Sequence, residues 1–182
     1  MKLPRLLPFL LLFSAGVAAG QERGLWLDVP FVQQEEEGCG AAAISMLLQY
    51  WNAKGMAVDP TRMDVLAIQR LLYSKAAHGI YASSLENYVR DSGFTVFAVQ
   101  GTWEDLEKHL KEGRPLILGI GPNHRKGPLH YLVAVGMDFK NPAVLVNDPA
   151  RGKLIRIERE AFAKQWQATS NWMLLAVPQQ AK

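Results

Sequence analysis

The spacing of apolar residues predicts helices in the first half of the chain. In the run AAAISMLLQYW, residues 41–51, Ala42, Met46 and Tyr50 fall on one face, as a helical period of 3.6 residues requires. Further helices are expected over 59–73, over 83–89 with Ser83 or Ser84 as cap, and over 102–110 with Thr102 as cap.

Short β-prone runs dominate the second half of the chain. They cover residues 115–120, 130–137, 143–147, 154–157 and 172–177, with a short helix expected at 160–166 and earlier strands at 27–32 and 94–99. Turn-forming stretches such as GPNHRKGP, FKNP and DPARG separate them. The pattern therefore predicts an α+β fold, in which a helical N-terminal half packs on an antiparallel sheet with a cleft between the two.

The first twenty residues have the three-part pattern of a secretory signal peptide. Lys2 and Arg5 precede an apolar stretch at 6–13, and small residues lead to a cleavage position after Ala19 or Gly20. An uncleaved membrane anchor is the alternative, which Pro8 and the short apolar stretch disfavour. We therefore expect one domain over 21–182 that is exported, to the periplasm or the medium, without stable membrane insertion after cleavage.

Charge and metal-binding patterns exclude several classes of function. Lys2 and Arg5 account for two of the 20 basic residues, so the remaining chain carries 18 basic and 17 acidic residues, a net charge of +1. No basic stripe interleaved with aromatic residues follows, so no nucleic-acid partner is expected. The sequence has no HExxH motif and no paired cysteines, so we expect no metal and no other cofactor.

Cys39 is the only cysteine in the chain, and it lies between two glycines where the 41–51 helix is about to begin. The positive end of a helix dipole and the free N–H groups of its first turn favour a thiolate, which is the nucleophilic form of the side chain. A buried, inert thiol or a disulfide to another chain are the alternatives. The Gly-Cys-Gly setting favours a nucleophile.

A cysteine nucleophile needs a base, and His130 is the best candidate because it opens the apolar run HYLVAVGM. A histidine at the mouth of a sheet faces the expected cleft, whereas a structural, hydrogen-bonded histidine is the alternative reading. The other histidines lie in a charged helical stretch, a polar loop and a connection between helices: His109, His124 and His78.

The residue that orients His130 should lie on the next strand, across the turn 139–142. Side chains alternate between the faces of a strand, so the register of pairing decides whether Asp148 or Asn147 shares a face with His130. The sequence leaves both open and favours Asp148, since Pro149 makes the residue before it extended.

The expected chemistry also needs hydrogen-bond donors for an oxyanion. The backbone N–H of Cys39 is one candidate, and the side-chain amide of Gln33, six residues earlier, is another. Gln34 is the neighbouring competitor for this role.

The segments VPFVQQEEEGCGAAAISMLLQYW, HYLVAVG and VLVNDPARG together resemble the papain-like cysteine peptidases that process double-glycine leader peptides of bacteriocins. In that family a glutamine precedes a Cys-Gly pair that opens a helix, and a histidine-led strand precedes an Asp-Pro pair. The resemblance covers residues 27–177. It implies a papain-like fold in which Gln33 is the oxyanion donor, Cys39 the nucleophile, His130 the base and Asp148 its orienting residue.

The chain resembles most the free-standing exported members of this family, because it carries an export signal and no transporter domain. The sequence thus predicts a cysteine peptidase that hydrolyses a peptide or protein substrate through a Cys39 thioester, with His130 as general acid and base. A thiol acyltransferase and a catalytically inactive peptide-binding module of the same fold are the alternatives. The substrate and the oligomeric state are not predicted.

Overall fold

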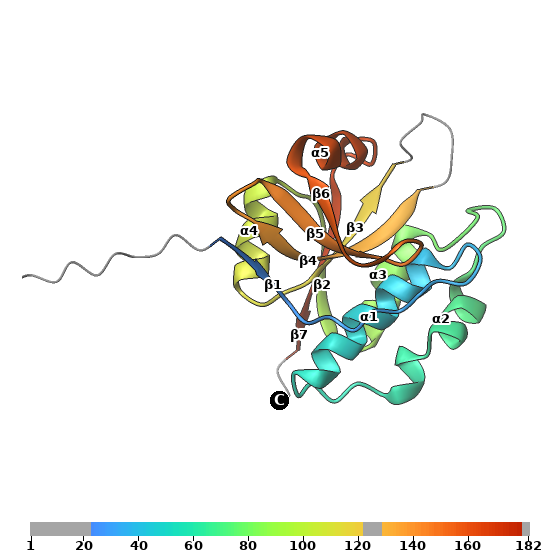
Figure 1. Ribbon diagram of the computed structural model, residues 1–182. Helices are drawn as coiled ribbons and strands as arrows, with labels where there is room; N and C mark the ends of the chain where they lie inside the picture. Colours follow the sequence, from blue (N-terminus) through green and yellow to red (C-terminus); the bar gives the residue numbers. More distant parts are fainter. Residues whose placement is uncertain (1–22, 122–128, 180–182) are drawn as a thin grey trace, which may run out of the picture.

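The computed structural model describes residues 23–121 and 129–179 (Figure 1). The expected signal peptide and His124 lie outside these residues. The helices are α1 (Cys39–Ala53), the 3₁₀ helix η1 (Pro60–Met63), α2 (Val65–Leu72), α3 (Ala82–Asp91), α4 (Trp103–Lys111) and α5 (Arg159–Gln167). The strands are β1 (Gly24–Trp26), β2 (Phe94–Gln100), β3 (Leu116–Ile120), β4 (His130–Asp138), β5 (Ala143–Asp148), β6 (Gly152–Glu158) and β7 (Trp172–Pro178).

The strands form one sheet with the order β2-β7-β3-β4-β5-β6, and β1 pairs with β4. All of these pairings are antiparallel, so the predicted α+β fold with an antiparallel sheet is confirmed. Strand β4 lies inside the sheet and is buried between its two end residues. None of the helices among the described residues is both long and apolar enough to cross a membrane.

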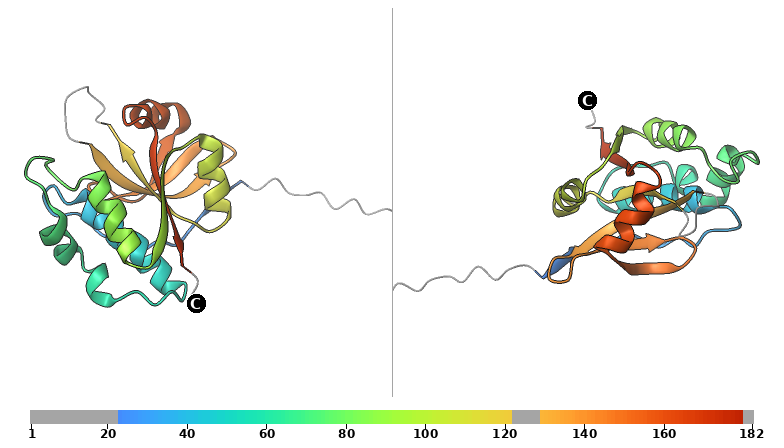
Figure 2. Two further views of the ribbon diagram at one scale, coloured as in Figure 1. Left: turned by 180° about the vertical axis from the view of Figure 1, so that it is seen from behind. Right: turned by 90° about the horizontal axis from the view of Figure 1, so that it is seen from above.

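Helices cover both faces of this sheet (Figure 2). On one face α1, α2 and α3 share a core with side chains of β3, β4 and β7, among them Ile117, Val133 and Leu174. On the other face α4 and α5 pack through Leu106, Phe162 and their neighbours. The apolar stripe of α4 belongs to this second core, so α4 lies on the face opposite α1, although both helices are in the first two thirds of the chain.

Most predicted elements are present, and three differ for local reasons. The single helix expected at 59–73 is divided, because Asp64 leaves the helical conformation and its carboxylate accepts the Ala67 N–H at 2.6 Å to cap α2. The helix expected from Ser83 or Ser84 begins at Ala82, after Tyr81, without a side-chain cap. In contrast, the cap expected at Thr102 is confirmed as a reciprocal capping box with Asp105.

The strand expected at 27–32 is absent, and β1 lies just before it. Pro30 removes a backbone donor from this segment, which makes a continuous ladder unfavourable. The segment instead links β1 to α1, as Figure 1 shows in blue, and its contacts bear directly on the site described below.

Candidate active site

Cys39 is the first residue of α1, which makes the helix start two residues before the apolar run begins. Gly38 occupies the cap position without a side-chain hydrogen bond, and the first helical bond runs from the Ala42 N–H to the Gly38 carbonyl. The earlier N–H groups therefore point out of the helix start, where they and the helix dipole favour an anion. The Cys39 residue is 9 % exposed, so its thiol is shielded from bulk water.

Gly40 lies in a tightly packed position beside Cys39. A Cβ at this position would lie 3.1 Å from the Cβ of Ile80 and 3.3 Å from the Cδ2 of Tyr131. Both neighbours are buried, so neither gives way without cost. The glycine after the cysteine thus brings the ring of Tyr131 close to the helix start.

His130 lies at the first residue of β4 and is held by Asp148 at the last residue of β5. Its Nε2 lies 2.7 Å from the Oδ1 of Asp148, which also accepts the Ala150 N–H at 3.0 Å. The Asp148 residue is only 3 % exposed. The Cys39 side chain lies near enough to the His130 ring to raise its pKa. Since Nε2 is engaged by Asp148, Nδ1 is the nitrogen left for the sulfur.

A β-bulge decides which residue of β5 reaches His130. Near the turn Met137 pairs with Val144, and this register alone would put Asn147 on the face of His130. Between Ala134 and Gly136 the register shifts by one, so that Val133 pairs with Asn147 instead. Beyond the shift, Asp148 shares a face with His130, and the structure brings these two side chains together.

The charges of the site favour a protonated His130. Burial acts to lower the pKa of the ring, but hydrogen bonds with Asp148 and Cys39, together with their negative charges, raise it to about 9. Burial would likewise raise the pKa of Asp148, yet the hydrogen bond and charge of His130 bring it below its usual value. At neutral pH the ring is therefore an imidazolium paired with the Asp148 carboxylate.

Tyr131 is a neighbour of this site that the sequence did not single out. Burial, then the charges of Cys39 and Glu86, raise its pKa to about 12. Its ring meets Trp172 edge-on, with 5.6 Å between centroids. In the sequence, Tyr131 looks like any other core residue of an apolar strand, so the pattern alone could not identify it as part of the site.

The two glutamines differ in their surroundings. Gln33 is exposed, which does not favour the role expected for it. Gln34 is half-buried, its backbone N–H donates to the Pro149 carbonyl at 3.1 Å, and its Oε1 is buried with no hydrogen-bond partner among the described residues. The structure thus favours Gln34, the competitor noted in the sequence.

Asn147 does not contact His130. It is fully buried, its Nδ2 donates to the Val29 carbonyl at 3.1 Å, and its Oδ1 accepts the Leu154 N–H at 3.1 Å. His78 also lies outside the pair and contacts the carboxylate of Glu37 at 2.9 Å.

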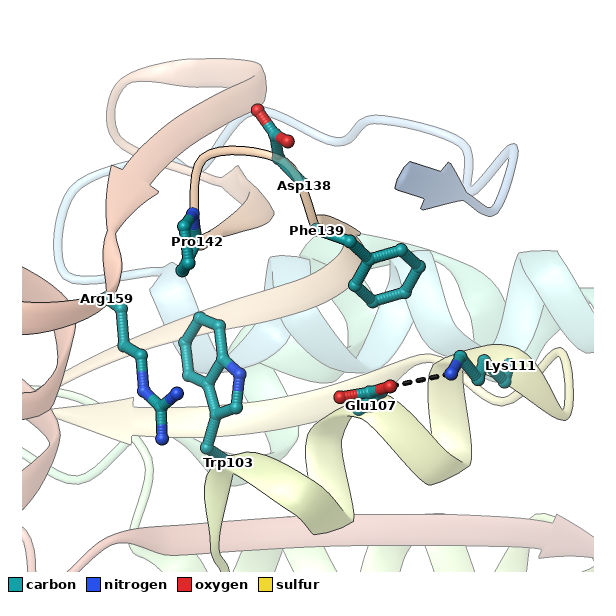
Figure 3. A pocket seen from close by; sticks show the side chains of 7 residues that line it. All are labelled: Trp103, Glu107, Lys111, Asp138, Phe139, Pro142 and Arg159. Atoms are coloured by element: carbon teal, nitrogen blue, oxygen red, sulfur yellow. Dashed lines mark hydrogen bonds and ion pairs between the residues drawn. The ribbon is translucent and has the colours of Figure 1, made fainter. Parts of the chain in front are cut away.

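Other parts of the described chain offer no comparable chemistry. In residues 23–121 and 129–179, no three His, Cys, Asp or Glu side chains gather as a metal site. A pocket of about 490 Å³ lies at the opposite end of β4, between α4 and the β4–β5 turn (Figure 3). Its Lys111 pairs with Glu107 at 2.6 Å, its Arg159 lies over the Trp103 ring and pairs with Glu104 at 3.7 Å, and its Asp138 pairs with Arg156 at 3.5 Å, so its charges already have partners.

Comparisons with known proteins agree with this geometry. Residues 26–173 match the model of the Peptidase_C39 like family. A comparison with curated protein sequences found no match.

Several solved structures share the fold. A putative C39-like peptidase from Bacillus anthracis is 18 % identical, with 87 % of this chain and 99 % of that chain covered and a TM-score of 0.66. A double glycine motif protease from an AMS/PCAT transporter, in complex with the leader peptide, is 24 % identical, with 85 % and 94 % covered and a TM-score of 0.62. The peptidase domain of Streptococcus ComA, a bi-functional ABC transporter involved in quorum sensing, is 18 % identical, with 82 % and 98 % covered and a TM-score of 0.63.

Proposed function

The chain belongs to the Peptidase_C39 like family, and from this premise we propose that it hydrolyses peptide bonds with Cys39 as nucleophile. The observation that carries the proposal is the His130 ring, which is hydrogen-bonded to the Asp148 carboxylate at 2.7 Å and whose pKa is raised by the nearby Cys39. A nucleophile, a base and a group that orients the base are the parts that covalent acyl transfer requires.

The proposed reaction has two stages. The Cys39 thiolate attacks the carbonyl carbon, the His130 imidazolium protonates the leaving amine, and a thioester remains on Cys39. Neutral His130 then accepts a proton from water, whose oxygen attacks the thioester and releases the new carboxyl end. Asp148 keeps the ring oriented and stabilises its charge in both stages.

We propose Gln34, rather than Gln33, as the side chain that donates to the oxyanion, together with the backbone N–H of Cys39. The support is the half-buried position of Gln34 and the bond from its backbone to Pro149, next to Asp148. The exposed side chain of Gln33 lacks such an anchor among the described contacts.

The substrate we propose is a peptide or an unstructured segment of a protein. A relative of this fold has been solved with a leader peptide, which supports peptide binding as the shared property. We propose that the protein acts in the periplasm or the medium, and the support is the export signal expected at 1–20. An intact mass of the exported protein that includes residues 1–20 would contradict the cleaved signal peptide and favour an uncleaved membrane anchor.

Cleavage of a peptide library by the wild type and by Cys39→Ala tests the proposed function. We expect cleavage that disappears in the variant, and the same products formed by both proteins would reject the mechanism. Labelled amines added to the assay separate hydrolysis from acyl transfer, because an acyltransferase incorporates the label. A wild type that neither cleaves peptides nor reacts through Cys39 would be the inactive binding module.

A further inference from the structure

Asn147 precedes Asp148 in β5, yet it takes no part in the contact with His130. We propose that Asn147 is a positioning residue for the oxyanion donor: it fixes the segment 29–34, and with it Gln34, against the strand end that carries Asp148. This inference rests on the proposed function and adds a residue to it. It is carried by the hydrogen bonds of the Asn147 amide and by the course of the segment.

The segment 27–34 has neither helix nor strand, so individual contacts determine where it lies. Its backbone is held at three points: the Leu27 N–H donates to the Val135 carbonyl at 2.7 Å, the Val29 carbonyl accepts from Asn147, and the Gln34 N–H donates to Pro149. Two of these three anchors come from the residues on either side of Asp148. The base-orienting carboxylate and the oxyanion donor therefore share one support.

The carboxamide of Asn147 is matched to this position. Its Nδ2 serves the Val29 carbonyl while its Oδ1 serves the Leu154 N–H, at the place where the β5–β6 register shifts between Val146 and Asp148. An aspartate at this position would still accept a hydrogen bond from the Leu154 N–H. However, it would place a second buried carboxylate beside Asp148, and it would have no N–H to donate to the Val29 carbonyl. Only a neutral group that both donates and accepts satisfies both backbone partners.

Loss of the amide should act on Gln34 and leave the His130–Asp148 contact in place. In Asn147→Ala the Val29 carbonyl loses its donor, and of the three backbone anchors only those at Leu27 and Gln34 remain. Removal of an oxyanion donor costs on the order of 10²–10³ in rate, and a displaced donor costs part of that. A selective loss of transition-state stabilisation, with an unchanged nucleophile, is the expected signature.

Two reagents separate these effects without knowledge of the natural substrate. Iodoacetamide alkylates a thiolate by direct displacement of iodide and forms no oxyanion. p-Nitrophenyl acetate acylates the thiolate through a tetrahedral oxyanion and releases p-nitrophenolate, which is measured by absorbance. Both rates are corrected for the background in Cys39→Ala. Val144→Ala is the matched control, because Val144 is a fully buried residue of the same strand that packs in the second core and, unlike Asn147, makes no side-chain hydrogen bond to the segment.

We expect Asn147→Ala to lower the acylation rate about tenfold and to leave the alkylation rate within about twofold, while Val144→Ala changes neither. In a Gln34→Ala background, Asn147→Ala should have almost no further effect on acylation. Asn147→Ser, whose hydroxyl cannot serve both partners, should behave in the same way if Asn147→Ala does not fold.

Three outcomes would overturn the inference: an unchanged acylation rate in folded Asn147 variants, an equal fall of both rates, or an acylation loss of the same size with and without Gln34. If wild-type Cys39 reacts with neither reagent, the proposed function fails as well. If wild-type Cys39 is acylated normally and the variants give one of the three outcomes, only the role of Asn147 fails.

Discussion

Replacing Asp148 with asparagine should lower the pKa of His130, because the ring loses the carboxylate that accepts its Nε2–H at 2.7 Å. In the wild type the pKa of this ring is raised from 6.5 to about 9, against the effect of burial. That difference corresponds to about 3 kcal/mol in favour of the protonated ring. In Asp148→Asn only the nearby Cys39 still opposes the effect of burial, so the pKa of His130 falls well below its wild-type value.

The same change should alter the pH dependence of stability. Because the pKa of His130 in the folded protein lies above the unfolded value of 6.5, the stabilisation is fully present below pH 6.5 and is lost as the pH rises through about 9. The wild type should therefore lose up to about 3 kcal/mol of unfolding free energy from this group across that window. Asp148→Asn should lose much less over the same range.

The assay is an NMR titration of the His130 Cε1 proton, assigned by its absence in His130→Ala, together with urea unfolding at pH 6.5 and pH 9. Asp138→Asn is the matched control, since Asp138 lies at the other end of β4 and its pKa is lowered mainly by the Asn141 N–H. The reasoning is refuted if His130 titrates at the same pH in Asp148→Asn as in the wild type and the control.

The remaining predictions concern the oxyanion donor, one helix cap and one glycine. Gln34→Ala should slow acylation of Cys39 by p-nitrophenyl acetate on the order of 10²-fold, while Gln33→Ala should keep a rate near that of the wild type. If Gln33→Ala instead shows the larger loss, Gln33 is the oxyanion donor. Thr102→Ala should cost about 1 kcal/mol in urea unfolding, because it removes the capping box of α4, whereas Ser83→Ala, in a helix without a side-chain cap, should cost nothing measurable. Gly40→Ala should destabilise the fold by about 1–3 kcal/mol in the same assay. An unchanged stability would show that Ile80 and Tyr131 move aside without cost.

The sequence identified candidate site residues best where the signal comes from the residues next to them in the chain. The Gly-Cys-Gly triplet before an apolar helix indicated Cys39, and the start of an apolar strand indicated His130, because each depends on residues next to it in the chain. The structure brings these two side chains together as the sequence predicted. The choice between Asp148 and Asn147 needed the register of two strands, which a single bulge changes by one residue. A bulge of this kind depends on packing across the sheet and leaves no clear mark in the sequence.

The least predictable part was the chain between β1 and α1. Its apolar residues alternate like those of a strand, but Pro30 and the anchors at Val135, Asn147 and Pro149 hold it as an irregular segment. These contacts join parts of the chain more than one hundred residues apart, so short-range patterns do not report them. For the same reason the environments of Gln33 and Gln34 could be separated only in three dimensions.

The rate of Cys39 alkylation by iodoacetamide as a function of pH, followed by intact mass, tests the central claim most directly. A thiolate paired with the imidazolium of His130 predicts rapid alkylation at pH 6, restricted to Cys39 and strongly reduced in His130→Ala. A wild-type rate at pH 6 no faster than that of His130→Ala, rising only above about pH 8.5 as for an ordinary free thiol, would contradict it.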